Sequence, residues 1–276
     1  MDKSRRVRIN ILIIVVCLVL LAQGAVPAAD VIDIPGLGGV AADYPGWIKQ
    51  GESFLDFAGG NITWGLVYYY RAFGHWPNRW QDVVAAGIHQ VPIIALSGDV
   101  INPDDGKFDC LGDVYYFPPN ANSPDAFIAK LSPNEGYRVK YTRVPVPDTF
   151  EKQFGDFFMN DEASARFDRQ SYVYWTATAE RRRFLAILGV VDKCMPNYYY
   201  VHGDYPQTWQ QFATSGLSPI DQSSVNPLTG GPFHGDGRAL DFQYTYYPAD
   251  KATQQSSFTI LPVDENGKTP SSWCTF

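Results

Sequence analysis

The chain has 276 residues, a formal net charge of −7 at neutral pH, and 15% aromatic against 18% charged residues. A negative surface repels phosphate backbones, so this balance of charge argues against a protein that binds nucleic acid. The length leaves room for one large domain or for two of ordinary size.

Residues 1–28 have the pattern of a secretory signal peptide. Basic residues between Lys3 and Arg8 precede an almost wholly apolar run of 14 residues, Ile9 to Ala22. This run suits a signal peptide better than a membrane span of about 20 residues. We expect cleavage before Ala29, which would change the net charge from −7 to −10. The alternative is an uncleaved signal anchor, which would attach the protein to a membrane.

A nine-residue sequence occurs twice, at a constant offset of 129 residues. Residues 74–82 (GHWPNRWQD) return as residues 203–211 (GDYPQTWQQ). In both copies a tyrosine triplet precedes this sequence, and an Asn-Pro pair and an aromatic stretch ending in proline follow it. Because several unrelated landmarks keep their order, duplication is a better explanation than chance. We predict two like modules, residues 29–147 and 179–276, joined by a linker of residues 148–178.

A long helix is predicted in each module from apolar residues at three- and four-residue steps. These residues are Phe54, Ala58, Ile62, Leu66 and Tyr69 in the first copy and Phe184, Leu188, Val191, Met195 and Tyr199 in the second. Gly59-Gly60 should weaken the first helix, and Pro196 should kink or end the second. The cationic run Arg181-Arg182-Arg183 is expected on the solvated side of the second helix.

A short helix is predicted after each long one. Pro77 and Pro206 fit its first position, where a missing N–H costs nothing, and Gly87 and Gly216 fit its left-handed stop. These limits predict a helix of about ten residues. Its inner face should hold Trp80, Val83 and Val84 in the first copy and Trp209, Phe212 and Ala213 in the second.

Small antiparallel sheets are predicted downstream of the short helices. Residues 137–141 alternate as a strand does, and residues 258–263 read as a strand before an Asn266-Gly267 turn. Each module is thus a long and a short helix packed on a small antiparallel sheet, which is an α+β fold. Residues 144–147 form a stiff tether. The linker after it carries an amphipathic aromatic stripe, Phe150, Phe154, Phe157 and Phe158, that should dock on a module or bind a partner.

These features together resemble the globular head of type IV pilin-like proteins, and most nearly the major pseudopilins of type II secretion. The resemblance rests on three features: the aromatic end of the long helix, the Gly-x-[Trp/Tyr]-Pro sequence before the short helix, and the Asn-Pro loop before the sheet. Residues 226–232 (NPLTGGP) are especially similar to the loop of many such heads. The resemblance covers roughly residues 47–118 and 179–263. It implies tandem pilin-like heads.

The N-terminus departs from the prepilin pattern. Gly24 is followed by Ala25-Val26-Pro27-Ala28-Ala29, so the glutamate that prepilins use in filament assembly is missing, and the apolar run lies before the glycine. We therefore expect an exported structural or interaction component of a cell-envelope or secretion assembly, periplasmic or extracellular, with other envelope or extracellular proteins as partners. The high aromatic content leaves a secreted glycan-binding or adhesive module as the alternative.

No sequence motif for catalysis is found. Histidine-containing zinc motifs, the Gly-x-Ser-x-Gly elbow, Cys-x-x-Cys and phosphate-binding glycine loops are all absent from the sequence. His75 stands where the second copy has Asp204, and none of His89, His202 and His234 has a histidine counterpart. Asp104 and Asp109 are the only acid pair that could be named for general acid/base chemistry. The chain is predicted not to be an enzyme.

Acidic loops after the Asn-Pro pairs are candidate calcium sites. The first contains Asn102, Asp104, Asp105, Asp109 and Asp113, and the second contains Asn226, Asp236 and Asp241. Ca²⁺ takes six to eight oxygen ligands in a flexible shell, and heads of the family that the chain resembles can hold calcium beside the sheet. The spacing is not that of an EF-hand, and such loops are also common as plain solvated turns. No cofactor other than Ca²⁺ is suggested.

Three cysteines remain after signal cleavage, Cys110, Cys194 and Cys274. An oxidising compartment allows one disulfide and leaves one thiol. Cys194 and Cys274 belong to the same module, and a C-terminal tail that returns to the long helix, as in many pilin heads, would allow a Cys194–Cys274 disulfide.

Overall fold

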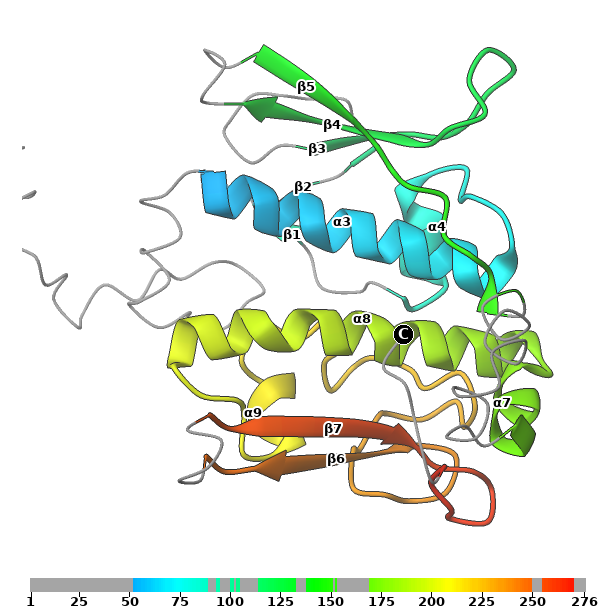
Figure 1. The fold of residues 1–276 in the computed structure, drawn as a ribbon, viewed down its shortest axis with the longest axis vertical. Coiled ribbons are helices and arrows are strands. Elements are labelled where there is room, and N and C mark those ends of the chain that lie inside the picture. Colours follow the sequence, from blue (N-terminus) through cyan, green and yellow to red (C-terminus); the bar gives the residue numbers. More distant parts are fainter. Residues whose placement is uncertain are drawn as a thin grey trace, which may run out of the picture.

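The structure is a computed structural model that describes residues 52–88, 93–94, 100–101, 103–104, 114–132, 138–150, 152, 169–249 and 255–270. These residues form an α+β fold in which two long helices lie side by side between two antiparallel sheets (Figure 1). The predicted signal peptide lies outside the described residues. No described helix is both long and apolar enough to cross a membrane.

The first half of the chain supplies one outer sheet and one central helix. Its helices are α3 (Glu52–Phe73) and α4 (Trp80–Ala85). Its strands are β1 (Ile93–Ile94), β2 (Val100–Ile101), β3 (Val114–Phe117), β4 (Phe127–Ser132) and β5 (Arg138–Arg143). Strands β3, β4 and β5 pair in that order as an antiparallel sheet over α3, and β1 pairs with β2 separately.

The second half supplies the other central helix and the other outer sheet. Its helices are α7 (Arg169–Thr176), α8 (Ala179–His202) and α9 (Trp209–Ala213). Its strands β6 (Phe242–Tyr247) and β7 (Ser257–Pro262) form a two-stranded antiparallel sheet. Helix α7 falls in the predicted linker, where Phe150 is fully buried, while Phe154, Phe157 and Phe158 lie outside the described residues.

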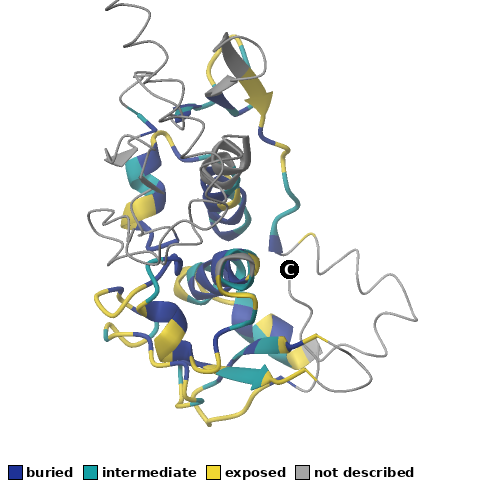
Figure 2. Ribbon diagram, turned by 90° about the vertical axis from the view of Figure 1, so that its left-hand side faces the viewer, coloured by how far each residue is buried: buried dark blue, intermediate teal, exposed yellow. Residues whose placement is uncertain are grey.

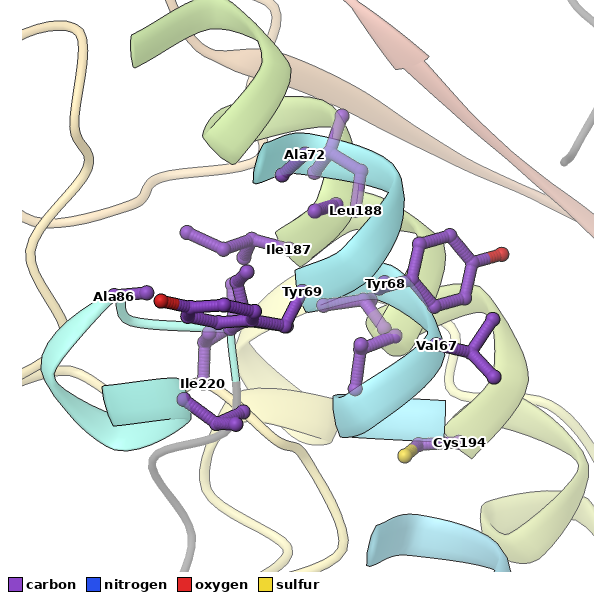
Figure 3. Packing of buried hydrophobic residues seen from close by; sticks show 14 of the residues in the cluster. Val67, Tyr68, Tyr69, Ala72, Ala86, Ile187, Leu188, Cys194 and Ile220 are labelled. Carbon is purple, nitrogen blue, oxygen red and sulfur yellow. The ribbon is translucent and has the colours of Figure 1, made fainter. Parts of the chain in front are cut away.

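The two long helices meet along their apolar stripes and create one continuous core. The buried residues of the predicted stripes include Ile62, Leu66, Tyr69, Phe184, Leu188, Val191 and Met195. At the crossing, the ring of Tyr68 lies over Gly189, where an added Cβ would come within 2.0 Å of Tyr68 Cε1. Figure 3 shows Tyr68 and Tyr69 of α3 among side chains of α8. Gly189 therefore permits a close approach of α3 and α8 that no larger residue allows.

The chain turns in the same way after each long helix. Gly74 and Gly203 both have left-handed backbone, with φ of 75° and 76°. Their N–H groups donate to the carbonyls of Tyr70 and Tyr199, each at 2.7 Å. A left-handed residue at this place ends a helix and satisfies its last carbonyls, and glycine adopts it without steric cost.

A tyrosine on each sheet is bonded to the loop before the short helix. The Tyr116 hydroxyl donates to the Pro77 carbonyl at 2.8 Å, and the Tyr244 hydroxyl donates to the Pro206 carbonyl. Each tyrosine also has a buried isoleucine as its cross-strand partner, Ile128 for Tyr116 and Ile260 for Tyr244. Burial raises the pKa of both phenols, as expected for hydroxyls that donate inside a core.

The short helices differ from prediction. They span six and five residues, begin at Trp80 and Trp209, and have Arg79 and Thr208 as N-caps, so the prolines lie two positions before the cap and not at the first helical position. The proline carbonyls are instead engaged by the sheet tyrosines. Trp80 and Trp209 are both 6% exposed, as predicted for an inner face, but Val84 is 39% exposed. The left-handed stops at Gly87 and Gly216 are confirmed, with φ of 72° and 74°.

The long helices are more regular than predicted. Helix α3 runs without a break through Gly59-Gly60, and α8 continues through Pro196 to His202. Both helices are buried between the sheets and pack against each other. This packing stabilises them beyond what local helix propensity allows.

The cationic run at the start of α8 is also placed differently from the prediction. Arg182 donates to the carbonyls of Ala72 and Thr176 at 3.1 and 2.8 Å, and Arg181 lies over the Tyr174 ring. The guanidinium of Arg182 thus satisfies a C-terminal carbonyl of α3 and ties the first half to the second.

Candidate functional site

The predicted calcium loop is only partly described by the structure. Asn102, Asp105, Asp109 and Asp113 lie outside the described residues. Asp104 is described, and its carboxylate accepts the N–H of Trp80 at 2.8 Å and of Gln81 at 3.4 Å. Asp104 therefore caps the N-terminus of α4, where a carboxylate also interacts favourably with the helix dipole.

The acidic residues of the second loop are held by protein donors. Asn226 is buried; its amide donates to the Leu240 carbonyl and its Oδ1 accepts from Leu228 N–H, both at 2.9 Å. Asp241 is buried and accepts from the N–H of His234 and Phe242. Asp236 pairs with Arg238, whose guanidinium lowers the pKa of this carboxyl to about 2. Within the part of the chain that the structure describes, no three His, Cys, Asp or Glu residues gather as a metal site.

The Cys194–Cys274 disulfide is not present in this structure. Cys194 carries a free, buried thiol that donates to Asn61 Oδ1 of α3 at 3.4 Å. Burial raises its pKa to about 12, so the thiol is a packed and unreactive group. Cys274 and Cys110 lie outside the described residues.

The described histidines and their neighbours form loop contacts. His75 Nδ1 lies 3.0 Å from the Trp76 carbonyl, and His202 contacts the Tyr198 ring. At the position matching His75, the Asp204 carboxylate accepts from the hydroxyls of Ser256 and Tyr246. The Ser256 bond foremost, with that of Tyr246, holds the pKa of Asp204 below its ordinary value. This carboxylate fastens the loop after α8 to the second sheet.

The outer face of the first sheet carries a different kind of feature. Val114, Tyr116 and Ile128 are buried on the inner face, over α3, so their neighbours along the strands point outward. The described residues of this outer face are Tyr115, Phe117, Phe127, Ala129, Tyr141 and Arg143. Tyr141 is 63% exposed, and Tyr115, Phe117 and Phe127 are partly exposed. We call these six residues the aromatic face (Figure 2 shows exposed positions on this sheet).

The rings of the aromatic face touch but are not coplanar. The ring centroids of Tyr115 and Phe117 are 4.4 Å apart with planes at 87°, and those of Phe117 and Tyr141 are 5.6 Å apart with planes at 50°. Ala129 stands between Tyr115 and Tyr141 in the register. At the rim, Arg143 forms an exposed ion pair with Asp125 at 2.7 Å. An apolar centre with a charged rim is the usual arrangement of a protein-binding surface.

The matching face of the second sheet is polar. Tyr244 and Tyr246 point inward, toward Pro206 and Asp204, so the alternate positions of the paired strands point outward. These are Gln243, Thr245 and Tyr247 of β6 and Ser257, Thr259 and Leu261 of β7. Among these six residues, Tyr247 is the only large hydrophobic side chain that is exposed, at 47%. Sheets β3-β4-β5 and β6-β7 thus place a matching tyrosine and isoleucine on their inner faces but present different chemistry on their outer faces.

The aromatic face was not predicted from the sequence, although a signal for it exists. Residues 114–117 (VYYF) are apolar at every position, whereas a strand with one solvated face alternates. A short strand that is apolar on both sides has either two buried faces or one exposed binding face. Only the position of β3 in the fold decides between them.

Comparisons with protein-family models, with curated proteins and with solved structures give no match to this chain.

Proposed function

We propose that this chain is a non-enzymatic, exported interaction protein, a component of a cell-envelope or secretion assembly that binds a partner protein through the aromatic face. The observation that carries the proposal is the contrast between the two outer faces. Tyr115, Phe117 and Phe127 are partly exposed where the second sheet has Gln243, Thr245 and Thr259, and Tyr141, at 63% exposure, lies on β5, for which the two-stranded second sheet has no counterpart. Large aromatic side chains on one exposed face are typical of binding surfaces on soluble proteins.

The pilin-like tandem is part of the same proposal. Its support is that both halves turn at a left-handed glycine, bury a tryptophan on a short helix, and bond a sheet tyrosine to the proline before that helix. We place the modules at residues 29–147 and 179–276. Duplication frees one copy to keep a purely structural role while the other acquires a binding surface.

A secreted glycan-binding module is the second candidate, because Tyr141 is exposed enough to stack on a sugar ring. The angles of 87° and 50° between neighbouring rings do not make a flat platform for a polysaccharide. They suit an irregular protein surface better. A protein partner is therefore the first choice.

Two matched variants test the proposal. Tyr141→Thr removes an exposed ring from the first outer face, and Tyr247→Thr removes one from the second; threonine is well tolerated in strands. In pull-downs from the native envelope, Tyr141→Thr should lose a partner that wild type and Tyr247→Thr both retain. Equal retention by the two variants would contradict the proposal. Binding of oligosaccharides on an array, lost in Tyr141→Thr, would favour the glycan alternative.

A further inference from the structure

The strand edges of the two outer sheets are not equally covered. On β3, the Tyr116 N–H donates to the Pro103 carbonyl at 2.7 Å. On β6, the Tyr244 N–H donates to the Gly235 carbonyl at 3.0 Å, so residues 235–237 lie along that edge. Other parts of the same chain therefore occupy the backbone groups of these two edges.

The outer edge of β5 is different, because its side chains are exposed on both faces. The order β3-β4-β5 places β5 at the edge of its sheet (Figure 1), and no described strand pairs with its outer side. Tyr141 and Arg143 point to the outer face and Thr142 to the inner face, and all three are exposed. Neither face of this edge is covered at these residues.

The register shows which backbone groups of β5 are available. Val144 N–H donates to the Ala126 carbonyl at 2.8 Å, on the side of β4. Residues of an antiparallel strand bond alternately to one side and to the other, so the even-numbered residues of β5 bond to β4. The N–H and C=O groups of Val139, Tyr141 and Arg143 consequently point away from the sheet. An open edge of this kind is a template for another strand.

We propose that two copies of this chain pair through β5, antiparallel and about a two-fold axis at Tyr141. Val139 of each copy then stands opposite Arg143 of the other, and Tyr141 stands opposite Tyr141. The outward backbone groups of the strand all find partners in this register. Lys140 of each copy stands opposite Thr142 of the other. Because the same edge is used on both copies, the pairing closes at a dimer.

Registers centred nearer the start of β5 oppose like charges. A two-fold axis at Val139 places Arg138 opposite Lys140, and an axis at Lys140 places this lysine opposite its own copy. Like charges directly opposite each other destabilise a strand pair. The third basic residue, Arg143, is already paired with Asp125 at 2.7 Å and stands opposite an apolar residue when the axis is at Tyr141.

Registers centred nearer the end of β5 meet a proline. An axis at Thr142 or at Arg143 brings Pro145 opposite an outward residue of the other copy. Proline has no N–H to donate, so such a pair loses a backbone hydrogen bond. Tyr141 is the centre that avoids both the like charges and the proline.

Pairing about Tyr141 joins the aromatic faces of two copies. Residues opposite each other on neighbouring strands point to the same face, so the two Tyr141 side chains lie side by side on the outer face. The joined sheet then presents one continuous aromatic surface across the axis. This consequence for partner binding rests on the proposed function, but the pairing itself does not.

Sedimentation velocity over a concentration series tests the pairing. We expect the unmodified chain to form a dimer whose fraction rises with concentration. Thr142→Lys places a lysine opposite Lys140 on both sides of the axis and should weaken the dimer at least about tenfold. Adding Lys140→Thr to this variant exchanges the two residues at unchanged composition and should restore the dimer. The control Ser257→Lys, at an exposed position of the second sheet, should leave it unchanged.

Three results of this experiment would overturn the proposal. The first is a chain that is monomeric at every concentration. The second is a dimer that Thr142→Lys weakens no more than Ser257→Lys does. The third is a weakened dimer that the exchange of residues 140 and 142 does not restore.

A single cysteine locates the two-fold axis. In a background in which every cysteine except the buried Cys194 is serine, Tyr141→Cys brings two thiols together at a hydrogen-bonded pair. The Cα atoms of such a pair are about 5.5 Å apart, which suits a disulfide. Thr142→Cys is the control, because Thr142 stands opposite Lys140 and not opposite its own copy. We expect at least about fivefold more disulfide-linked dimer with Tyr141→Cys, and equal yields would overturn the register.

Tyr141→Thr separates the pairing from the proposed function. Threonine keeps the backbone groups of residue 141 and is well tolerated in strands, so the dimer should persist while the envelope partner is lost. A monomeric wild type whose partner is still lost in Tyr141→Thr would overturn the pairing alone. A dimer with equal retention of the partner by both proteins would overturn the proposed function alone.

Discussion

The two halves of this molecule share an interior and differ at the surface. Trp80 and Trp209 are equally buried, and Tyr116 and Tyr244 bond to matching prolines. The outer face of the first sheet is aromatic, and that of the second is polar. The interior contacts are those that a helix-and-sheet module needs to fold, so they are kept in both halves. The outer faces are free to differ, and function is therefore best sought there.

The halves also reach the same local structure by different contacts. In both, the third residue of the short helix accepts from the two N–H groups that precede the helix: Asp82 from Asn78 and Arg79, and Gln211 from Gln207 and Thr208. The helix N-terminus is capped by the local Thr208 in the second half. In the first half Arg79 stands in its place, and the cap is supplied by Asp104, which accepts from the N–H of Trp80, 24 residues earlier in the chain.

The largest expected effect concerns the two tryptophans. Trp80→Ala and Trp209→Ala should each lower the free energy of unfolding by about 3–5 kcal/mol, because each removes a large buried ring. Urea denaturation of both variants measures this directly. A cost near that of a surface substitution for one tryptophan, with a large cost for the other, would show that the two positions are not equivalent.

The crossing of α3 and α8 should make two glycines at matching positions respond differently to substitution. An added Cβ at Gly189 would meet the Tyr68 ring, whereas one at Gly60 has no atom within 4 Å. Gly189→Ala should therefore destabilise by about 1–3 kcal/mol through overpacking. Gly60→Ala should stabilise by roughly 0.5–1 kcal/mol through helix propensity. Thermal melts of the pair would contradict the packing if both substitutions shifted the melting temperature in the same direction.

Removing the N-terminal caps of the short helices α4 and α9 should lower stability by a smaller amount. A capping residue copied from one half should compensate for a cap lost in the other. Asp104→Ala and Thr208→Ala should each cost about 1 kcal/mol, since each removes an acceptor for helix N–H groups. Arg79→Thr, which copies the second half, should restore most of the loss in Asp104→Ala. Absence of such rescue in denaturation curves would argue against the capping role.

The loop that contains Asp104 was also predicted to bind Ca²⁺. If the loop of residues 102–113 binds Ca²⁺, millimolar Ca²⁺ should raise the melting temperature by several degrees, more than Mg²⁺ does. The shift should disappear in Asp109→Ala, at a position separate from the Asp104 cap. Identical melting curves with calcium and with chelator would remove the calcium prediction.

The smallest expected effect is on pH dependence. The Ser256 and Tyr246 hydroxyls lower the pKa of Asp204 in the folded state, so its contribution to stability is present above the unfolded value of 3.8. That contribution is lost as pH falls through the folded pKa. Asp204→Asn should therefore lose less stability than wild type on acidification below about pH 4. Parallel pH profiles for the two proteins would contradict this role of Asp204.

The sequence was most informative about features set by local periodicity. The apolar stripes of α3 and α8, the glycine stops at Gly87 and Gly216, and strands β5 and β7 follow from local sequence patterns. These features depend on which residues recur within one or two turns of a helix or along one strand. Local patterns carry that information.

The sequence was misleading where distant contacts decide the outcome. Pro77 and Pro206 were placed inside the short helices, but tyrosines 38 and 39 residues away engage their carbonyls. Arg182 was expected in solvent, yet it binds the carbonyl of Ala72, 110 residues away. The aromatic face was missed because a strand sequence does not tell whether its second face is covered.

Oxidative footprinting of the partner-bound protein tests the central claim most directly. Hydroxyl radicals modify exposed tyrosines, and Tyr141 and Tyr247 are both exposed in the free protein, at 63% and 47%. The account predicts that the envelope partner recovered with wild type protects Tyr141 and leaves the oxidation of Tyr247 unchanged. Protection of Tyr247 with continued oxidation of Tyr141 would contradict it, because binding would then use the polar face and not the aromatic one.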